Sequence, residues 1–305
     1  MAVVLAAAGI LTAPSATAAP AETPSWSQSR LAFVRANQIY TSSLTGASVT
    51  KITSSAKSYR PHWSPDGLRI AFVHESSPGV RDIWVMDADG SHKQQVTRLG
   101  DATEPTWSPD GATLAFGANG TPPYATSGRQ LRTVRSTAPF GESTPVPDSN
   151  DIGSAAVVGT LAWSPDGGKI AYYSDSFPSS PDHYLLVYTI ATHQIDEVAA
   201  IGGACCGEGG FSDPTWTPDG TALAYTTTEV DGTGVVGPRL AVTDVASQAP
   251  KAFPTIVGDA DPDYSPDGTR VTFTHWSSIY RANLDGSRRV LVTTGYQPDW
   301  RPFRS

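Results

Sequence analysis

The chain has 305 residues, only 16% of them charged, and its 21 Lys and Arg against 29 Asp and Glu give a formal net charge of −8. The basic residues are scattered, which argues against nucleic acid and anionic membrane surfaces as partners, because both are recognised by clustered basic patches. Glycine (28) and proline (25) are frequent and no stretch shows a sustained 3.6-residue apolar period, so we predict an all-β protein with almost no helix.

The N-terminus has the features of a secretory signal. Apolar Ala2–Leu11 is followed by small residues that end in Ala16-Thr17-Ala18, a pattern typical of a cleavage site. We predict a signal peptide over residues 1–19, a short linker over 20–29, and an exported protein, either secreted or periplasmic at the cell envelope. No Lys or Arg precedes Arg30, which leaves open a start upstream of Met1. Ten apolar residues are fewer than the roughly 20 that span a bilayer, so no membrane insertion is expected after signal removal.

Three strands are predicted next, at Leu31–Val34, Gln38–Tyr40 and Val49–Ile52. They correspond to the second, third and fourth strands of a unit that is then repeated along the chain. The first strand of this unit is absent from residues 30–53.

The repeated unit begins with an aromatic strand that runs into a Ser/Thr-Pro-Asp-Gly turn, in which Pro fixes φ and Gly accepts a positive φ. Its copies cover residues 61–67, 105–111, 161–167, 214–220 and 262–268. Their aromatic residues, together with that of a shortened copy near the C-terminus, are 36 to 56 residues apart and are Trp63, Trp107, Trp163, Trp216, Tyr264 and Trp300. Such a period in a β-rich chain predicts a β-propeller, in which each repeat is one blade.

Further strands are predicted after each turn. The second strands are predicted at Leu68–Val73, Thr113–Gly117, Lys169–Tyr173, Ala222–Thr226 and Arg270–Thr274. The clearest third strands are Asp82–Met86, Tyr184–Ile190, Arg239–Thr243 and Ser278–Ala282, and the clearest fourth strands are Lys93–Thr97 and Arg289–Thr293. Four short antiparallel strands make one blade.

Two long loops interrupt the third repeat, at Asn119–Gln130 and Ala138–Gly153. They are either recognition loops on a rigid scaffold or tolerated surface insertions. At the C-terminus, Gln297–Arg301 is a first strand without a blade of its own. We therefore predict six four-stranded antiparallel blades, closed by this C-terminal strand joining the N-terminal blade.

The repeat resembles a known family. Trp63-Ser64-Pro65-Asp66-Gly67, followed by Ile70-Ala71-Phe72 and then by residues 83–91 (IWVMDADGS), closely resembles the WD40-like (PD40) repeat of TolB-type β-propellers. The resemblance covers residues 30–303 and implies one six-bladed propeller over 30–305. It also implies a binding scaffold that presents loops and a channel mouth to a protein or peptide partner at the cell envelope. We expect the protein to be a monomer.

Charged residues precede the aromatic strands, on the loops predicted to enter each innermost strand. These residues are Arg60, Asp101, Glu104, Glu208, Asp213, Asp259 and Asp261. Because such loops gather around one mouth of a propeller channel, we hypothesise a ligand-binding ring that attracts a cation or a basic segment of a partner. The alternative for each acid is that it accepts backbone N–H bonds in a tight turn.

Cys205 and Cys206 are the only cysteines, and they are adjacent in a glycine-rich stretch that enters the same face. Neighbouring Cα atoms lie about 3.8 Å apart, short of the usual disulfide separation of roughly 4.4–6.8 Å, so a bridge between them is strained. A vicinal disulfide that forms part of the ligand site, two free thiols and an intermolecular bridge all remain open.

Catalytic signatures are absent from the sequence. The six histidines show no metal-ligand spacing, and there is no Gly-x-Ser-x-Gly. We predict a non-catalytic binding protein without a cofactor. The alternative is an enzyme at the channel mouth, a metal-assisted hydrolase or lyase acting on a glycan or ester, and the sequence leaves a divalent metal open.

Overall fold

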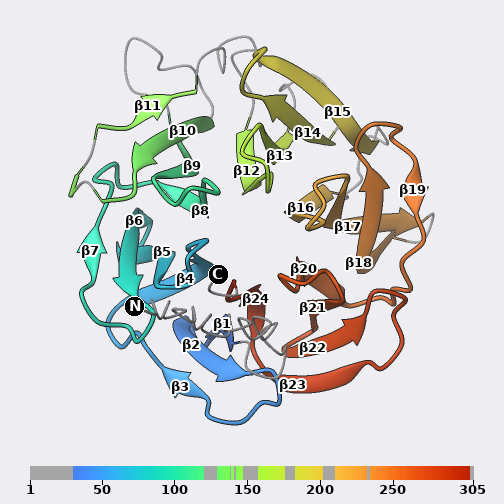
Figure 1. Ribbon diagram of the computed structural model, residues 1–305, viewed down its shortest axis with the longest axis horizontal. Coiled ribbons are helices and arrows are strands. Elements are labelled where there is room, and N and C mark those ends of the chain that lie inside the picture. Colours follow the sequence, from blue (N-terminus) through green and yellow to red (C-terminus); the bar gives the residue numbers. More distant parts are fainter. Residues whose placement is uncertain are drawn as a thin grey trace, which may run out of the picture.

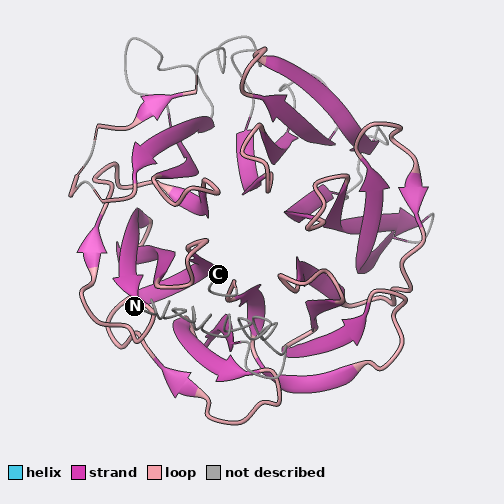
Figure 2. Ribbon diagram, in the orientation of Figure 1, coloured by secondary structure: helices cyan, strands magenta, loops and turns pink. Residues whose placement is uncertain are grey.

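The computed structural model describes residues 30–119, 129–137, 139–140, 142–146, 157–175, 183–201, 210–231 and 234–302. The regular elements in these ranges are all strands, as Figure 2 shows. Accordingly, this part of the chain holds no helix with the length and hydropathy of a membrane span. The predicted all-β class is confirmed.

Six antiparallel sheets of four strands form a ring around a central axis (Figure 1). Blade 1 consists of β24, β1, β2 and β3, and blades 2 to 6 follow in chain order. The innermost strands of blades 1 to 6 are β24 (Tyr296–Trp300), β4 (Lys57–Trp63), β8 (Thr103–Trp107), β12 (Val157–Trp163), β16 (Gly210–Trp216) and β20 (Asp259–Tyr264). The second strands are β1 (Arg30–Arg35), β5 (Arg69–Ser77), β9 (Thr113–Asn119), β13 (Lys169–Asp175), β17 (Ala222–Asp231) and β21 (Arg270–His275).

The outer half of each blade completes the sheet. The third strands are β2 (Gln38–Ser43), β6 (Val80–Asp87), β10 (Arg129–Arg135), β14 (His183–Thr189), β18 (Gly234–Asp244) and β22 (Ser278–Asn283). The outermost strands are β3 (Thr50–Lys51), β7 (Gln94–Gln95), β11 (Thr144–Pro145), β15 (Gln194–Ile201), β19 (Pro250–Lys251) and β23 (Val290–Thr294). The six-bladed propeller predicted from the repeats is thus confirmed.

The Ser-Pro-Asp-Gly turn links the first two strands of a blade by the same set of bonds each time. In blade 2, Ser64 Oγ donates to Asp66 Oδ1 at 2.5 Å and accepts the Arg69 N–H at 2.9 Å. Asp66 Oδ1 also accepts the Leu68 N–H at 2.9 Å, and Gly67 has a φ of 64°. The side chains therefore satisfy the backbone that the reversal leaves unpaired, and glycine removes the steric cost of the positive φ.

The hydrophobic core lies between the blades rather than in a single centre. One cluster joins Ile83 of blade 2 to Leu114 and Phe116 of blade 3. The aromatic residue of the motif also ties neighbouring blades together. Trp107 Nε1 donates to the backbone oxygen of His62, in blade 2, at 2.9 Å. Neighbouring blades thus share hydrophobic clusters and hydrogen bonds.

The C-terminal strand closes the ring. β24 pairs with β1 in antiparallel fashion, with Trp300 opposite Leu31. Beyond β24, the Arg301 N–H donates to the Arg30 carbonyl at 2.9 Å. The closure predicted from the unpaired C-terminal strand is therefore correct.

The largest differences from the predicted bounds are in blade 5, where β17 ends at Asp231 instead of Thr226 and β18 begins at Gly234 instead of Arg239. Two outermost strands are shorter than predicted. β7 covers Gln94–Gln95 instead of Lys93–Thr97, and β3 covers Thr50–Lys51 instead of Val49–Ile52. An outermost strand pairs on one side only, so its ladder ends where the third strand turns away. β23 begins at Val290, one residue later than predicted.

Several predictions concern residues outside the described ranges. They are the signal peptide and linker over 1–29, residues 120–128 of the first long loop, residues 138, 141 and 147–153 of the second, and Cys205, Cys206 and Glu208.

Candidate functional site

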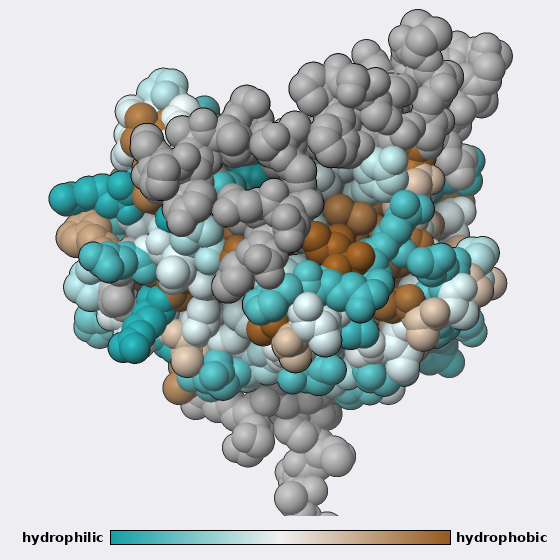
Figure 3. Space-filling view, turned by 90° about the horizontal axis from the view of Figure 1, so that it is seen from above, coloured by the Kyte–Doolittle hydropathy of each residue, from teal (hydrophilic) through white to brown (hydrophobic). Residues whose placement is uncertain are grey.

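The six innermost strands enclose a central cavity of about 540 Å³. Its walls are formed by the aromatic and proline side chains of the repeated motif, together with polar residues that project between them. Figure 3 looks onto the outer rim, where hydrophilic side chains border a smaller hydrophobic group near the middle of the view. The channel encloses far more of a small ligand than this rim, so it is the candidate site.

A ring of six polar residues projects into the channel. Each lies three positions before the motif's aromatic residue, and the members of this channel ring are Arg60, Glu104, Thr160, Asp213, Asp261 and Gln297. All except Thr160 precede a proline and have a positive φ, of 50° to 58°. At the same point the pairing with the second strand shifts register in every blade. Each innermost strand therefore forms a β-bulge at this position, with an Xaa-Pro pair in five of the six blades, and the bulge turns the side chain toward the channel.

The structure places four of the predicted site residues differently from the prediction. Arg60, Glu104, Asp213 and Asp261 were expected on loops before the innermost strands, but they lie within β4, β8, β16 and β20. The bulge accounts for the difference. It locally interrupts the alternation of side chains between the two faces of the sheet, but the strand continues beyond it.

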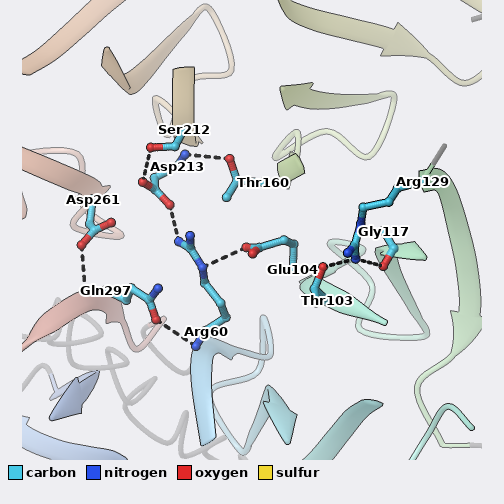
Figure 4. Close-up of polar contacts among 10 residues, drawn as sticks. All are labelled: Arg60, Thr103, Glu104, Gly117, Arg129, Thr160, Ser212, Asp213, Asp261 and Gln297. Carbon is cyan, nitrogen blue, oxygen red and sulfur yellow. Dashed lines mark hydrogen bonds and ion pairs between the residues drawn. The ribbon is translucent and has the colours of Figure 1, made fainter. Parts of the chain in front are cut away.

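Arg60 lies at the centre of the channel ring (Figure 4). Its Nε is 3.0 Å from Glu104 Oε2 in blade 3, and its Nη1 forms an ion pair with Asp213 Oδ1 in blade 5. Blades 2 and 5 are opposite one another in the six-membered ring. The Arg60 side chain thus crosses the channel, and it remains 25% exposed to solvent.

Other members of the channel ring join neighbouring blades. Thr160 Oγ1 accepts the Asp213 N–H at 2.8 Å, and Gln297 Oε1 accepts the Arg60 N–H at 3.0 Å. The Gln297 N–H in turn donates to Asp261 Oδ2 at 3.0 Å. These residues therefore stabilise the ring as well as lining the channel.

Burial and charge give the ring carboxyls different properties. Burial disfavours the charged form of Asp213, but the charge of Arg60 and the hydrogen bonds from Ser212, Asp261 and Arg60 together outweigh it and lower the pKa. Burial and the charge of Asp213 raise the pKa of Asp261 to about 7. Burial also raises the pKa of Glu104, although Arg60 opposes this effect. Burial disfavours the charged form of Arg60, but Asp213 and Glu104 outweigh it and raise the pKa.

A second ring lies two residues further along each strand, directly before the aromatic residue. Its members are His62, Thr106, Ala162, Thr215, Asp263 and Asp299. Asp299 Oδ2 accepts the Trp63 N–H at 2.7 Å, and its Oδ1 is 3.7 Å from His62 Nε2. Burial raises the pKa of Asp299 to about 8. Burial and the neighbouring Asp299 raise the pKa of Asp263 well above its ordinary value, while burial lowers that of His62.

Two of the predicted site residues hold loops instead of facing the cavity. Asp101 Oδ2 accepts the Asn119 N–H at 2.8 Å. The Asp259 side chain is 1% exposed, and it pairs with Arg289 and with His275 Nδ1 at 2.9 Å. Asp259 Oδ2 also accepts the Ile256 N–H at 3.0 Å, which is the backbone bond given above as the alternative, whereas Asp101 accepts an N–H from a distant strand.

The structure adds five residues that the sequence analysis missed, namely His62, Thr160, Asp263, Gln297 and Asp299. Their positions relative to the aromatic residue carried the signal, since each aligns with a member of one of the two rings. Within the described ranges, no three His, Cys, Asp or Glu side chains are grouped as a metal site would require. The channel thus combines an ion-pair cluster with buried carboxyls that hold protons near neutral pH.

Comparison with known proteins identifies the scaffold. Residues 13–126 match the family model described as the TolB beta propeller domain. TolB from Acinetobacter baumannii is similar in structure, with a TM-score of 0.71 and 18% identity over 92% of this chain and 68% of that chain. No curated protein sequence matches the chain. The resemblance to TolB-type propellers is therefore confirmed.

Two similar structures come from other functional classes. A chain in a nidogen–laminin complex has a TM-score of 0.63 and 12% identity over 91% of this chain and 99% of its own. An oligogalacturonate lyase in complex with manganese has a TM-score of 0.54 and 15% identity over 84% of this chain and 70% of its own. At these identities the similarity shows the fold alone.

Proposed function

We propose that this TolB-type propeller is an exported, non-catalytic binding protein whose channel takes up a segment of a protein or peptide partner at the cell envelope. The observation that carries the proposal is the solvent-accessible ion-pair cluster of Arg60, Glu104 and Asp213 inside a cavity with aromatic and proline walls. Rigid aromatic walls supply contact area, and charged groups at the centre supply orientation and specificity.

Two further observations support this function. Propellers of this fold occur in TolB and in a nidogen–laminin complex, which fits a protein-binding role. The apolar N-terminal segment with its Ala-x-Ala pattern supports export.

Charge-neutral substitutions in the channel test the proposal. The double variant Glu104→Gln, Asp213→Asn is used as bait in an envelope extract, beside a control with Asp89→Asn and Glu197→Gln at exposed positions. Both variants lose two negative charges, so they differ only in where the charges are removed. We expect the control to capture the same specific partner as the wild type, identified by mass spectrometry, and the channel variant to capture at least about tenfold less. Equal capture by the two variants would count against the channel as the binding site.

One observation favours the alternative enzyme. The charge of Asp213 acts on the Asp261 carboxyl, and the pKa values of the two groups are moved apart, a pattern found in acid–base pairs. The oligogalacturonate lyase has the same fold. Turnover of an oligogalacturonate in the presence of Mn²⁺ that Asp261→Asn abolishes would establish catalysis, whereas an inert glycan series would leave binding as the function.

A further inference from the structure

Arg60 obstructs the channel that the proposed function needs to be open. Its side chain reaches from β4 in blade 2 to Asp213 in β16, on the opposite blade (Figure 4). A segment that enters the channel past the channel ring therefore meets this ion pair and has to move the guanidinium.

Moving Arg60 leaves its carboxylates without a counter-charge. The Asp213 and Glu104 side chains are only 12% and 19% exposed, so water compensates them poorly once Arg60 is gone. Five carboxyl groups line the cavity, from Glu104, Asp213, Asp261, Asp263 and Asp299. Arg60 is the one Lys or Arg among the described lining residues. An uncharged or acidic segment thus enters at a high cost, while a cationic one replaces the charge it displaces.

The chemistry of the site favours a guanidinium over other cations. The carboxylates of Glu104 and Asp213 come from different blades and bind separate nitrogens of one planar group, Nε and Nη1 of Arg60. A guanidinium presents several donors in fixed directions, whereas an ammonium is a compact point charge. Exchange of one guanidinium for another preserves both ion pairs, so the partner's remaining contacts decide whether it binds.

We propose that the site between Glu104 and Asp213 is a guanidinium site, which Arg60 fills when the channel is empty and an arginine of the partner segment takes when it binds. This inference rests on the proposed function and specifies the chemistry of the ligand. Arg60 thereby acts as an internal competitor that excludes segments without a matching cation.

The test uses two capped pentapeptides, Gly-Ser-Arg-Ser-Gly and the same peptide with citrulline, which has nearly the shape of arginine but no charge. Binding to the wild type and to Arg60→Met, which keeps an apolar stem, is measured by calorimetry at pH 8. We expect Arg60→Met to bind the arginine peptide at least about tenfold tighter than the wild type does. We also expect it to prefer arginine to citrulline at least about tenfold, and Asp213→Asn added to Arg60→Met to remove this preference.

Equal binding of the two peptides by Arg60→Met, or binding of the arginine peptide no tighter than by the wild type, overturns the proposal. Arg60→Gln replaces Arg60→Met if the latter does not fold, with the same expected results. A partner that the channel captures in the envelope extract without any preference for arginine over citrulline would retain the binding function and reject the guanidinium site. The experiments can therefore reject the guanidinium site without rejecting the proposed binding function.

Discussion

The Asp299 carboxyl shows how one buried residue makes stability depend on pH. Its pKa is raised from 3.8 to about 8, so the folded protein holds the proton more tightly than the unfolded chain does. The stability from this group is fully present below pH 3.8 and is lost as the pH rises toward 8. The charge of Asp299 also raises the pKa of Asp263, and His62 Nε2 lies 3.7 Å from Asp299 Oδ1, so a change at Asp299 also affects these two neighbours.

We therefore predict that Asp299→Asn makes the protein more stable than the wild type at pH 9 but not at pH 4. The amide oxygen still accepts the Trp63 N–H but carries no charge. One pKa unit corresponds to about 1.4 kcal/mol, and because the neighbours share the effect we expect a gain of roughly 1–3 kcal/mol. Urea unfolding across this pH range measures it. The exposed substitution Asp89→Asn is the control, and parallel pH profiles for wild type and Asp299→Asn would refute the explanation.

At the scale of the element, the Ser-Pro-Asp-Gly turn is stabilised by its own side chains. Ser108 is 5% exposed, donates to Asp110 Oδ1 at 2.5 Å and accepts the Thr113 N–H at 3.0 Å. Ser108→Ala leaves that N–H without its acceptor, and we expect a loss of roughly 1–2 kcal/mol. The urea midpoint should fall with an unchanged m-value. Ser54→Ala, at an exposed position, should change stability by less than about 0.5 kcal/mol, and equal effects of the two changes would contradict the role of Ser108.

These turns were predictable from sequence because each is determined by five consecutive residues. The bulges of the channel ring were not, although the pairs Arg60-Pro61 and Asp261-Pro262 were visible. An Xaa-Pro pair is compatible with a loop as well as with a bulged strand, and register is set by pairing with the second strand. The Arg60–Asp213 ion pair joins residues 153 positions apart, so only the closed ring brings them together.

For the whole molecule, the repeat count and the unpaired C-terminal strand were enough to predict six blades and their closure. The short outermost strands were overestimated because β7 and β3 consist of polar residues that pair on one side only. The fold was predictable because the same motif recurs in blade after blade. The type of site residue differs from blade to blade, so no repetition supports its prediction.

We expect the packing of the closing strand β24 to contribute much of the free energy of unfolding. Trp300 in β24 is 4% exposed, and its N–H donates to Asp263 Oδ2 of blade 6 at 2.6 Å. We predict that Trp300→Ala costs roughly 3–5 kcal/mol, as for other buried aromatic residues. Trp276→Ala removes the same side chain where it is 65% exposed, and thermal unfolding should show a much smaller change. A loss for Trp300→Ala no larger than that for Trp276→Ala would contradict a stabilising role of the buried Trp300 side chain.

The pairing of β24 with β1 also sets the order in which the protein can be assembled. The first blade receives its innermost strand last, from residues made 261 positions after β1 ends. Until then β1 has a free edge, whether the chain is leaving a ribosome or a translocation pore, and a free edge pairs readily with other chains. A chain whose synthesis stops before β24 therefore keeps the open edge of β1. A closed ring forms only after β24 has been made.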